Sequence, residues 1–436
     1  MNKNLIFIIG GVLVVIIIGI VIFALTGGNN NNGNNNQNQV VLTYWGLWEP
    51  ESVMQSLIQK YEAQNPGVKI QYVQKPFTQY DANLYTRIQL NAVDNTPAPD
   101  IVRLNNTWLS KYQTLLSPLP NDKMSPNTYA STFYPTAIKD YTGTDGRIYA
   151  VPLEIDGLTM FYNKKLLTAA GITTPPTDWD TFIEVSKKLT KKDSKGKITQ
   201  AGAALGSSKN IMHSADILNL LFLQNSFEII DSSNKVVNLE STRAVSALDF
   251  YTSFTSTHNT WSTELGNDLE VFYSGKLAIM FAPSWRAFDI INSAPNIEFG
   301  VAPVPQLPGN TPVNYAMYWG EAVPATSKYK EQAWDFILYL SRAENMKEMY
   351  SNSSQIRAFG EPYSRVDLNS ELLNQPYVGA IMEMAPTMTA WKMGEQGYVE
   401  ENLRTAINQV NNGAKADEAL REAQTRINTK LSEVVK

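Results

Sequence analysis

Two carboxylates that lie two residues apart are the first candidates for chemistry in this chain. Glu154 and Asp156 fall on an extended segment, where residues i and i+2 point to the same face. Such a pair could hydrolyse glycosidic bonds, a reaction that uses two carboxyl groups. It could also simply accept hydrogen bonds from sugar hydroxyls, a role that suits ionised carboxylates. A buried structural role is the third alternative.

Other reactive groups are sparse in the sequence. There is no cysteine, which excludes disulfides and thiolate metal sites. The two histidines, His213 and His258, lie far apart without the spacing of metal ligands, and we expect them on the surface or in the core. No P-loop and no Gly-x-Ser-x-Gly nucleophile motif occurs. We therefore expect no metal site, no cofactor and no catalytic nucleophile.

The composition favours an ordinary globular protein that is rich in aromatic residues. The chain is 43% hydrophobic and 18% charged, and its net charge is −5 without a basic run, which disfavours a nucleic-acid partner. Roughly 400 residues follow position 39, too many for one ordinary core, so we expect two domains. Nine Trp, 21 Tyr and 16 Phe supply flat faces that either fill cores or stack on ligands.

The N-terminal residues have the pattern of a membrane anchor. Residues 5–25 are apolar apart from three glycines, and no charged residue occurs between Lys3 and Glu49. A spanning helix needs about 20 apolar residues, whereas the apolar region of a cleavable signal has about 7–15. We therefore predict a transmembrane helix within residues 1–26, with the rest of the chain outside because Lys3 favours a cytoplasmic N-terminus. Cleavage of a long signal peptide near Ala24 is the alternative.

A linker is predicted directly after this segment. Residues 27–39 contain only Gly, Asn and Gln, so they offer nothing apolar to bury. A segment of this kind cannot offset the entropy that ordering would cost. We therefore expect a flexible connection between the anchor and the globular part of the chain.

Beyond the linker, alternating strand and helix patterns indicate an α/β fold. Strands are predicted at 40–45 and 68–73, with a helix of one apolar face at 51–64 between them, which forms a βαβ unit and implies a parallel sheet. Trp179 and Trp334 lie on predicted helices and are expected in the core. The further strands are predicted at 100–104, 148–153, 159–162, 277–282 and 298–304, and the further helices include 80–92, 245–254, 331–340 and 416–434.

Several stretches spread over the chain together carry a family resemblance. They include LTYWGLWEPESVMQSLIQKYEAQNPGVKI, GRIYAVPLEIDGLTMFYNKKLLTAAGITTPPTDWDTF, FYSGKLAIMFAPSW and WGEAVPATSKYKEQAWDFILYLS. In order and spacing, the chain resembles the extracellular solute-binding proteins of carbohydrate ABC transporters, the maltose-binding-protein-like group. The resemblance implies a periplasmic-binding-protein-like (type II) fold, with two α/β lobes, a hinge and a cleft between the lobes. The first lobe would comprise residues 40–153 with 312–350, and the second 154–311 with 351–436.

The resemblance also implies which residues line the cleft. They are aromatic and polar residues on loops at strand ends: Trp45, Trp48, Asn105, Asn106, Trp108, Glu154, Asp156, Trp285, Trp319, Glu321 and Trp391. Aromatic faces would pack the apolar faces of a sugar, and polar side chains would bind its hydroxyls. We favour ligand stacking for Trp285 and Trp391. For Trp48, Trp108 and Trp319, both stacking and core packing stay open.

These observations predict a membrane-tethered extracellular or periplasmic receptor that captures a carbohydrate and delivers it to the permease of an ABC transporter. We expect a monomer that closes around the sugar and catalyses no reaction. Bacterial relatives outside the periplasm are often lipoproteins, but this chain has no cysteine and would depend on its apolar segment for anchoring. Two alternatives stay open: a surface glycosidase that uses Glu154 and Asp156, and a binding protein for a peptide or polyamine.

Overall fold

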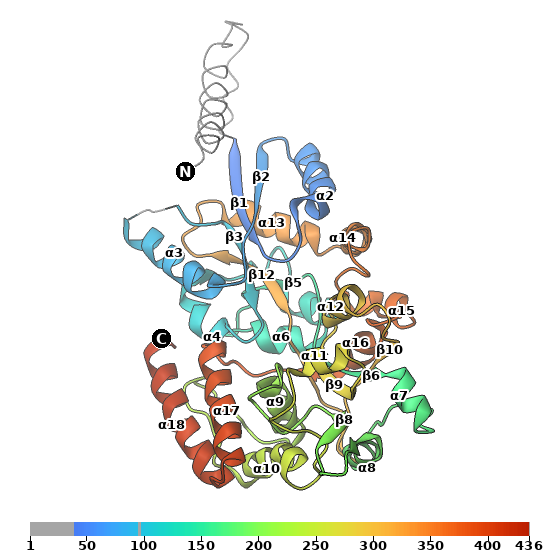
Figure 1. Ribbon diagram of the computed structural model, residues 1–436. Helices are drawn as coiled ribbons and strands as arrows, with labels where there is room; N and C mark the ends of the chain where they lie inside the picture. Colours follow the sequence, from blue (N-terminus) through green and yellow to red (C-terminus); the bar gives the residue numbers. More distant parts are fainter. Residues whose placement is uncertain (1–38, 95–96, 436) are drawn as a thin grey trace, which may run out of the picture. The chain divides into compact units, whose positions relative to one another are not determined.

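The computed structural model describes residues 39–94 and 97–435 (Figure 1). The residues from Val40 to Lys436 form one compact unit. The predicted anchor at residues 1–26 and the predicted linker, apart from Gln39, lie outside the described residues. Within the part of the chain that is described, no helix combines the length and the apolar character needed to cross a membrane.

The first sheet takes its strands from two separate parts of the chain. Its order is β2-β1-β3-β12-β4, and β5 pairs with β12. β1, β2 and β3 run parallel, as the βαβ pattern predicts, whereas β12 runs antiparallel to β3 and makes the sheet mixed. The strands are β1 (Val40–Gly46), β2 (Val68–Gln74), β3 (Ile101–Asn105), β4 (Leu116–Ser117), β5 (Val151–Pro152) and β12 (Trp319–Pro324).

The first βαβ unit follows directly from its sequence. α2 (Glu51–Gln64) connects β1 to β2 and buries Val53, Met54, Leu57, Ile58 and Tyr61. These are apolar positions spaced by three and four residues, which share one face of a helix. The helix predicted at 51–64 is therefore confirmed. The strand predicted at 148–153 is largely wrong, because only Val151 and Pro152 form a strand, while Ile148 makes an isolated bridge with Thr142.

The second sheet is built from the middle of the chain. Its order is β10-β6-β9-β8-β7, and all seven residues of its central strand β9 are buried. A small third sheet pairs β11 (Asn314–Tyr315) with β13 (Met388–Thr389). The strands of the second sheet are β6 (Leu158–Asn163), β7 (Lys191–Lys192), β8 (Ile198–Ala203), β9 (Leu277–Pro283) and β10 (Phe299–Ala302).

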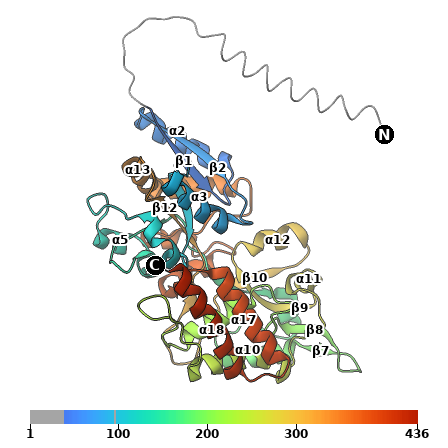
Figure 2. The same ribbon diagram turned by 90° about the vertical axis from the view of Figure 1, so that its left-hand side faces the viewer.

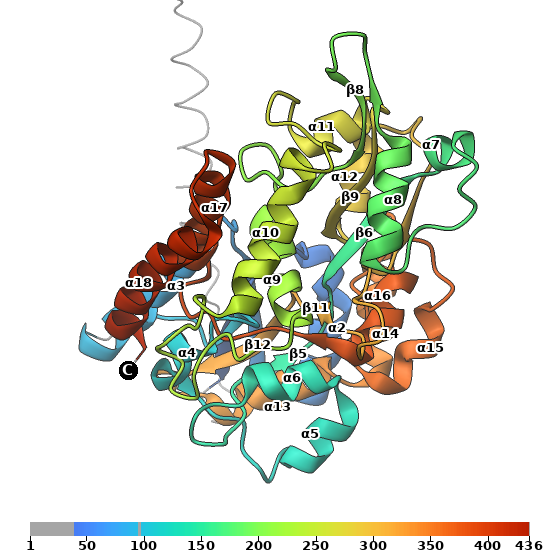
Figure 3. The same ribbon diagram turned by 90° about the horizontal axis from the view of Figure 1, so that it is seen from below.

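Helices cover both sheets, as three views of the unit show (Figures 1, 2 and 3). Trp179 of α8 and Trp334 of α13 are buried in the core, as predicted. The helices nearest the first sheet are α3 (Tyr80–Asp94), α4 (Leu109–Tyr112), α5 (Pro126–Thr132), α6 (Pro135–Tyr141), α13 (Lys330–Leu340) and α14 (Ala343–Ser354). The others are α7 (Lys164–Ala169), α8 (Trp179–Leu189), α9 (Ser214–Gln224), α10 (Thr242–Ser256), α11 (Asp268–Tyr273), α12 (Arg286–Ser293), α15 (Asn369–Leu372), α16 (Gly379–Met384), α17 (Gln396–Asn411) and α18 (Ala416–Val434).

The C-terminal helices pack against the second half of the fold. α17 and α18 lie side by side, shown in red in Figure 1, and both contact α10. Along α18, Leu420, Ala423, Ile427 and Leu431 are buried, which confirms the apolar face predicted for 416–434. Short 3-10 turns at Gln113–Leu115, Val366–Leu368 and Ala385–Thr387 complete the described elements.

Candidate ligand-binding site

Two of the nine tryptophans keep more than a third of their surface exposed, although most large apolar residues of this unit are buried. Trp48 is 39% exposed and Trp285 is 40% exposed. Large aromatic surface in water is unfavourable unless a partner or ligand covers it. Trp48 follows β1 and Trp285 follows β9, so each lies at the end of a strand in a different sheet. Loops at strand ends are the usual place for binding residues in α/β proteins.

Trp48 belongs to a cluster of rings that we call the first aromatic group: Trp48, Phe77, Trp108 and Trp319. The Trp48 ring lies 5.2 Å from Phe77 and 6.2 Å from Trp319, measured between centroids. Trp108 contacts Trp319 from the buried side, at 5.1 Å. Phe77 is 54% exposed, so two rings of the group face water and two are buried. The group forms because Trp319 of the antiparallel strand β12 pairs with Asn105 at the end of β3.

Trp285 belongs to a more polar cluster, the second aromatic group: Met212, His213, Trp285 and Arg286. The Arg286 guanidinium lies 4.1 Å from the centroid of the Trp285 ring, and Arg286 also contacts the Met212 sulfur. His213 meets Trp285 edge to face, with ring centroids 6.3 Å apart. Met212 is 42% exposed, which extends the apolar surface next to Trp285. This group could offer a ligand both an aromatic face and polar side chains.

The two predicted carboxylates lie on the segment that crosses from the first sheet to the second. Glu154 forms a 2.8 Å ion pair with Arg103, which in turn lies 2.8 Å from Glu49, the residue after Trp48. Asp156 accepts hydrogen bonds from the Ser284 hydroxyl at 3.0 Å and the Ser284 amide at 3.3 Å. Ser284 directly precedes Trp285. Each carboxylate therefore holds one of the loops that carry the exposed tryptophans.

Arg103 is the centre of a buried charged cluster behind the first aromatic group. It lies 2.8 Å from Glu49 and Glu154 and 3.4 Å from Glu321. Burial raises the pKa of Glu49 and Glu154, while Arg103 opposes the rise. Burial also raises the pKa of Glu321 to about 7, again against the effect of Arg103. A guanidinium removed from water needs several acceptors, and these carboxylates supply them.

A second set of polar side chains includes His213, the edge-to-face neighbour of Trp285. His213 Nδ1 is 2.8 Å from Asp216 Oδ2, and Gln396 donates to Glu400 Oε1 at 2.7 Å. The Trp108 indole N–H donates to Gln396 Oε1 at 3.1 Å and so connects the first aromatic group to this set. Burial, then the charge of Asp216, raises the pKa of Glu400 to about 7. His213 Nε2 and Asp216 Oδ1 have no hydrogen-bond partner among the described residues.

Comparison with known proteins gives the family. A family model described as bacterial extracellular solute-binding protein matches residues 56–358. The chain belongs to this family. A maltotriose-binding protein of Pyrococcus abyssi is 21% identical over 373 residues, 81% of this chain and 74% of that protein. A maltooligosaccharide ABC transporter solute-binding lipoprotein of Streptococcus pneumoniae is 25% identical over 246 residues, 53% of this chain and 54% of that protein.

Solved structures agree on the fold of this solute-binding protein. A cyclo/maltodextrin-binding protein complexed with maltotetraose matches with a TM-score of 0.75 at 20% identity. The match covers 92% of this chain and 100% of that chain. The α/β fold with two lobes that the resemblance implies is therefore confirmed.

Trp391 occupies a different environment from the exposed tryptophans of this solute-binding protein. Its side chain is buried, and its indole N–H donates to Asn219 Oδ1 of α9 at 3.0 Å. Trp45 is half-buried on β1, with the Lys75 ammonium 4.3 Å from its ring centroid. Neither residue belongs to the two aromatic groups.

The predicted asparagines hydrogen-bond to neighbouring protein groups. Asn105 accepts from the Thr107 amide at 3.0 Å and from its hydroxyl at 2.8 Å. Asn106 donates to Asp140 at 3.0 Å, and both side chains are buried. These bonds shape the loop that positions Trp108.

Sequence reasoning missed the residues that support the two tryptophans. Arg103 falls within a strand pattern, where the residue type gave no reason to expect a buried ion-pair centre. His213 and Asp216 are three residues apart, a spacing that brings side chains together on a helix, and this spacing was the available signal. Phe77 lies in a loop, and neither its type nor its spacing distinguished it from core residues.

Proposed function

We propose that this solute-binding protein captures a carbohydrate outside the cell and delivers it to the permease of an ABC transporter. The observation that carries the proposal is the pair of exposed aromatic groups, one on each lobe. Glu154, through Arg103, contacts the loop of Trp48, and Asp156 contacts the loop of Trp285. Sugar rings present apolar faces that suit aromatic side chains and hydroxyls that suit polar ones. The relatives from P. abyssi and S. pneumoniae are a maltotriose-binding protein and a maltooligosaccharide ABC transporter solute-binding lipoprotein, which favours a carbohydrate ligand over a peptide or polyamine.

In this proposal the sugar joins the two lobes. Trp48 and Phe77 would stack on it from the lobe of residues 40–153 and 312–350. Trp285 would stack from the lobe of residues 154–311 and 351–436, and the polar set of His213, Asp216 and Glu400 would bind its hydroxyls. A ligand that contacts both lobes favours the closed arrangement over the open one, which is how capture would be signalled to a permease.

We propose binding without catalysis. A retaining or inverting glycosidase needs two carboxyl groups that flank the scissile bond. Here Glu154 is paired with Arg103 and Asp156 is hydrogen-bonded to Ser284, so both carboxylates already have protein partners. The matched family is one of binding proteins, which is consistent with this assignment.

We further propose that the protein is a monomer attached to the membrane by residues 5–25, with residues 27–39 as a flexible tether. The membrane anchor is supported by the uncharged apolar run of the sequence. The intact chain should fractionate with membranes and keep its N-terminus. A mature protein that begins near Thr26 and is found free in the medium would contradict the anchor.

Isothermal titration calorimetry of the full chain in detergent tests the function. Maltose, maltotriose, maltotetraose and other glycans would be titrated beside short peptides and polyamines. We expect saturable binding of at least one oligosaccharide with a stoichiometry of one, and no shorter product on chromatography after prolonged incubation. Binding of a peptide or polyamine with no response to any glycan would overturn the carbohydrate assignment. Cleavage of the glycan that Glu154→Gln abolishes would establish the glycosidase instead.

A further inference from the structure

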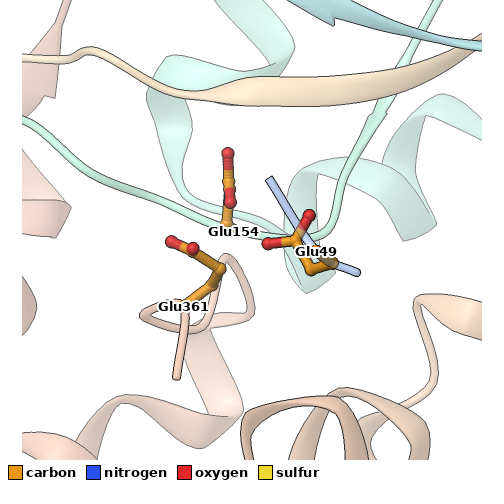
Figure 4. A group of neighbouring side chains, drawn as sticks. All are labelled: Glu49, Glu154 and Glu361. Carbon is orange, nitrogen blue, oxygen red and sulfur yellow. The ribbon is translucent and has the colours of Figure 1, made fainter. Parts of the chain in front are cut away.

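Three glutamates from distant parts of the chain gather beside the first aromatic group. Glu49 follows Trp48, Glu154 lies on the crossing segment, and Glu361 lies on the segment after α14. Figure 4 shows the three side chains next to one another. One oxygen from each residue can be chosen so that all three lie within 4.8 Å of one another. Calcium binds oxygen ligands at about 2.3–2.6 Å, so one ion could contact all three.

Two buried oxygens of this cluster have no hydrogen-bond donor. Glu49 Oε1 and Glu154 Oε2 find no partner among the described residues, although these side chains are only 7% and 5% exposed. The other oxygen of each carboxylate is occupied by Arg103 at 2.8 Å. Arg357 lies 3.8 Å from Glu49 Oε1, which is beyond hydrogen-bonding distance. A buried carboxylate oxygen without a donor is costly, so these two atoms indicate a missing partner.

The charges of the cluster point the same way. Four carboxylates meet two guanidiniums: Arg103 contacts Glu49, Glu154 and Glu321, and Arg357 contacts Glu361 at 2.6 Å. When all six groups are ionised, four negative charges and two positive ones leave an excess of two negative charges. Without a further cation, burial opposes this ionised state by raising the pKa of Glu49, Glu154 and Glu321. One divalent cation would balance the cluster, because a bound ion is the largest local charge in such a site.

We propose that Glu49, Glu154 and Glu361 together bind one calcium ion. Carboxylate oxygens alone, without His or Cys, suit calcium or magnesium rather than zinc. Magnesium requires distances of about 2.0–2.1 Å in strict octahedral geometry, whereas calcium accepts longer and less regular contacts. Glu361 is the most exposed of the three, with 16% of its side chain in contact with water, and it marks the side from which the ion enters.

The ion would connect both aromatic groups. Through Glu49 it would fix the loop of Trp48 to the crossing segment. Through Glu361 it would fix the segment that contains Phe359, which contacts Phe288 of α12 with ring centroids 4.3 Å apart. α12 begins directly after Trp285. Calcium would therefore hold together three chain segments that the ion pairs alone leave with unsatisfied oxygens.

The first test uses the full chain in detergent, freed of metal with EDTA, and no sugar. We expect calorimetric titration with calcium chloride to give one ion per chain, with a Kd of about 10⁻⁴ M, as in extracellular calcium modules. The midpoint of thermal unfolding should rise by several degrees with calcium, and magnesium chloride at equal concentration should raise it less. No heat of binding and no shift at about 10 mM calcium would overturn the site.

The second test locates the ion. Glu361→Gln should weaken calcium binding at least tenfold, because it removes one charged ligand from a partly exposed position. The matched control is Glu348→Gln: the Glu348 side chain on α14 is 23% exposed, and its partners are Lys60 and Ser56 rather than a residue of the cluster. This control should bind calcium like the unaltered protein. Equal binding by all three proteins, or equal loss in both variants, would contradict the assignment.

A third measurement does not depend on any variant. Terbium replaces calcium in oxygen sites and emits when a nearby tryptophan absorbs light. Trp48 adjoins the ligand Glu49, so excitation of tryptophan in the unaltered protein should give terbium emission that calcium displaces. Absence of sensitised emission, or emission that calcium leaves unchanged, would overturn the proposal even if Glu361→Gln failed to fold.

Discussion

The two aromatic groups expose a tryptophan in different ways. In the first group, Trp48 rests on Phe77 and Trp319, and these rings continue into the core through Trp108. In the second, the neighbours of Trp285 are the guanidinium of Arg286 and the imidazole of His213. The first group is supported by ring contacts in front of a buried ion-pair cluster. The second is supported by single polar contacts close to water.

The difference between ring support and polar support suggests that the two groups contribute differently to ligand binding, one through apolar area and the other through selectivity. Stacked rings give broad apolar area with little directional preference. A ring beside polar side chains can also select among hydroxyl patterns, because buried polar groups left without a partner cost free energy. We therefore expect the first lobe to supply affinity for sugar rings in general and the second to supply specificity.

The largest effect is expected behind the first group. Arg103→Met would leave Glu49, Glu154 and Glu321 buried without their cation. Removing one partner of a buried ion-pair set typically costs about 3–5 kcal/mol, and the free energy of unfolding measured with denaturant should fall by that amount. Arg147→Met is the matched control, because Arg147 pairs with Asp145 and its side chain is 58% exposed. A loss below about 1 kcal/mol for Arg103→Met would show that the cluster is not essential to the first lobe.

The polar set of His213, Asp216, Gln396 and Glu400 should make stability depend on pH. Burial and Asp216 raise the pKa of Glu400 from 4.5 to about 7. The folded chain then holds more protons than the unfolded chain between these values, so the free energy of unfolding falls as pH rises through this window, by up to about 3 kcal/mol. Glu400→Gln should flatten the profile and stabilise the protein at pH above 7.

The control for this prediction is the neighbouring residue. Glu401→Gln alters a side chain that is 70% exposed and paired with the same Arg404, so it should leave the profile unchanged. Identical pH profiles for Glu400→Gln and the unaltered protein would show that Glu400 does not carry the effect.

The next effect compares the two tryptophans directly. Trp48→Ala and Trp285→Ala should each weaken sugar affinity by about 1–3 kcal/mol, the range for a lost aromatic contact, with the fold intact. Because the residues lie in separate groups, the double variant should lose roughly the sum. Calorimetric titration with a verified glycan measures all three.

Trp391→Ala serves as the comparison for the two exposed tryptophans, because it removes a buried one. Trp391 is buried and bonded to Asn219, so its removal should lower the free energy of unfolding more than either exposed tryptophan does. A variant that loses sugar affinity at unchanged stability would instead support the stacking role that the sequence predicts for Trp391.

The smallest effect is expected at Arg286. Its guanidinium lies over the Trp285 ring, and a cation–π contact at an exposed site contributes about 0.5–1 kcal/mol. Arg286→Met should therefore change sugar affinity by less than about 1 kcal/mol, as measured by the same titration. A tenfold or larger change would mean that Arg286 itself binds the ligand.

The sequence by itself determined many of the helices and strands, and it determined the family. The buried face of α2, the fully buried strand β9 and the core positions of Trp179 and Trp334 follow from apolar spacing within one segment. Such patterns are local, since every helix or strand places its own residues on faces with a fixed period. The resemblance rests on several segments in order, and it gave the fold correctly.

Only the tertiary structure decided which candidate side chains face water and which partners they have. The sequence favours ligand stacking for Trp391 and leaves the role of Trp48 open, yet Trp48 is exposed and Trp391 is buried and bonded to Asn219. Glu154 and Asp156 share one extended segment, yet Glu154 pairs with Arg103 of β3, whereas Asp156 accepts from Ser284, which follows β9 of the other sheet. Contacts between residues far apart in the chain depend on how the sheets and loops pack, and no local period carries that information.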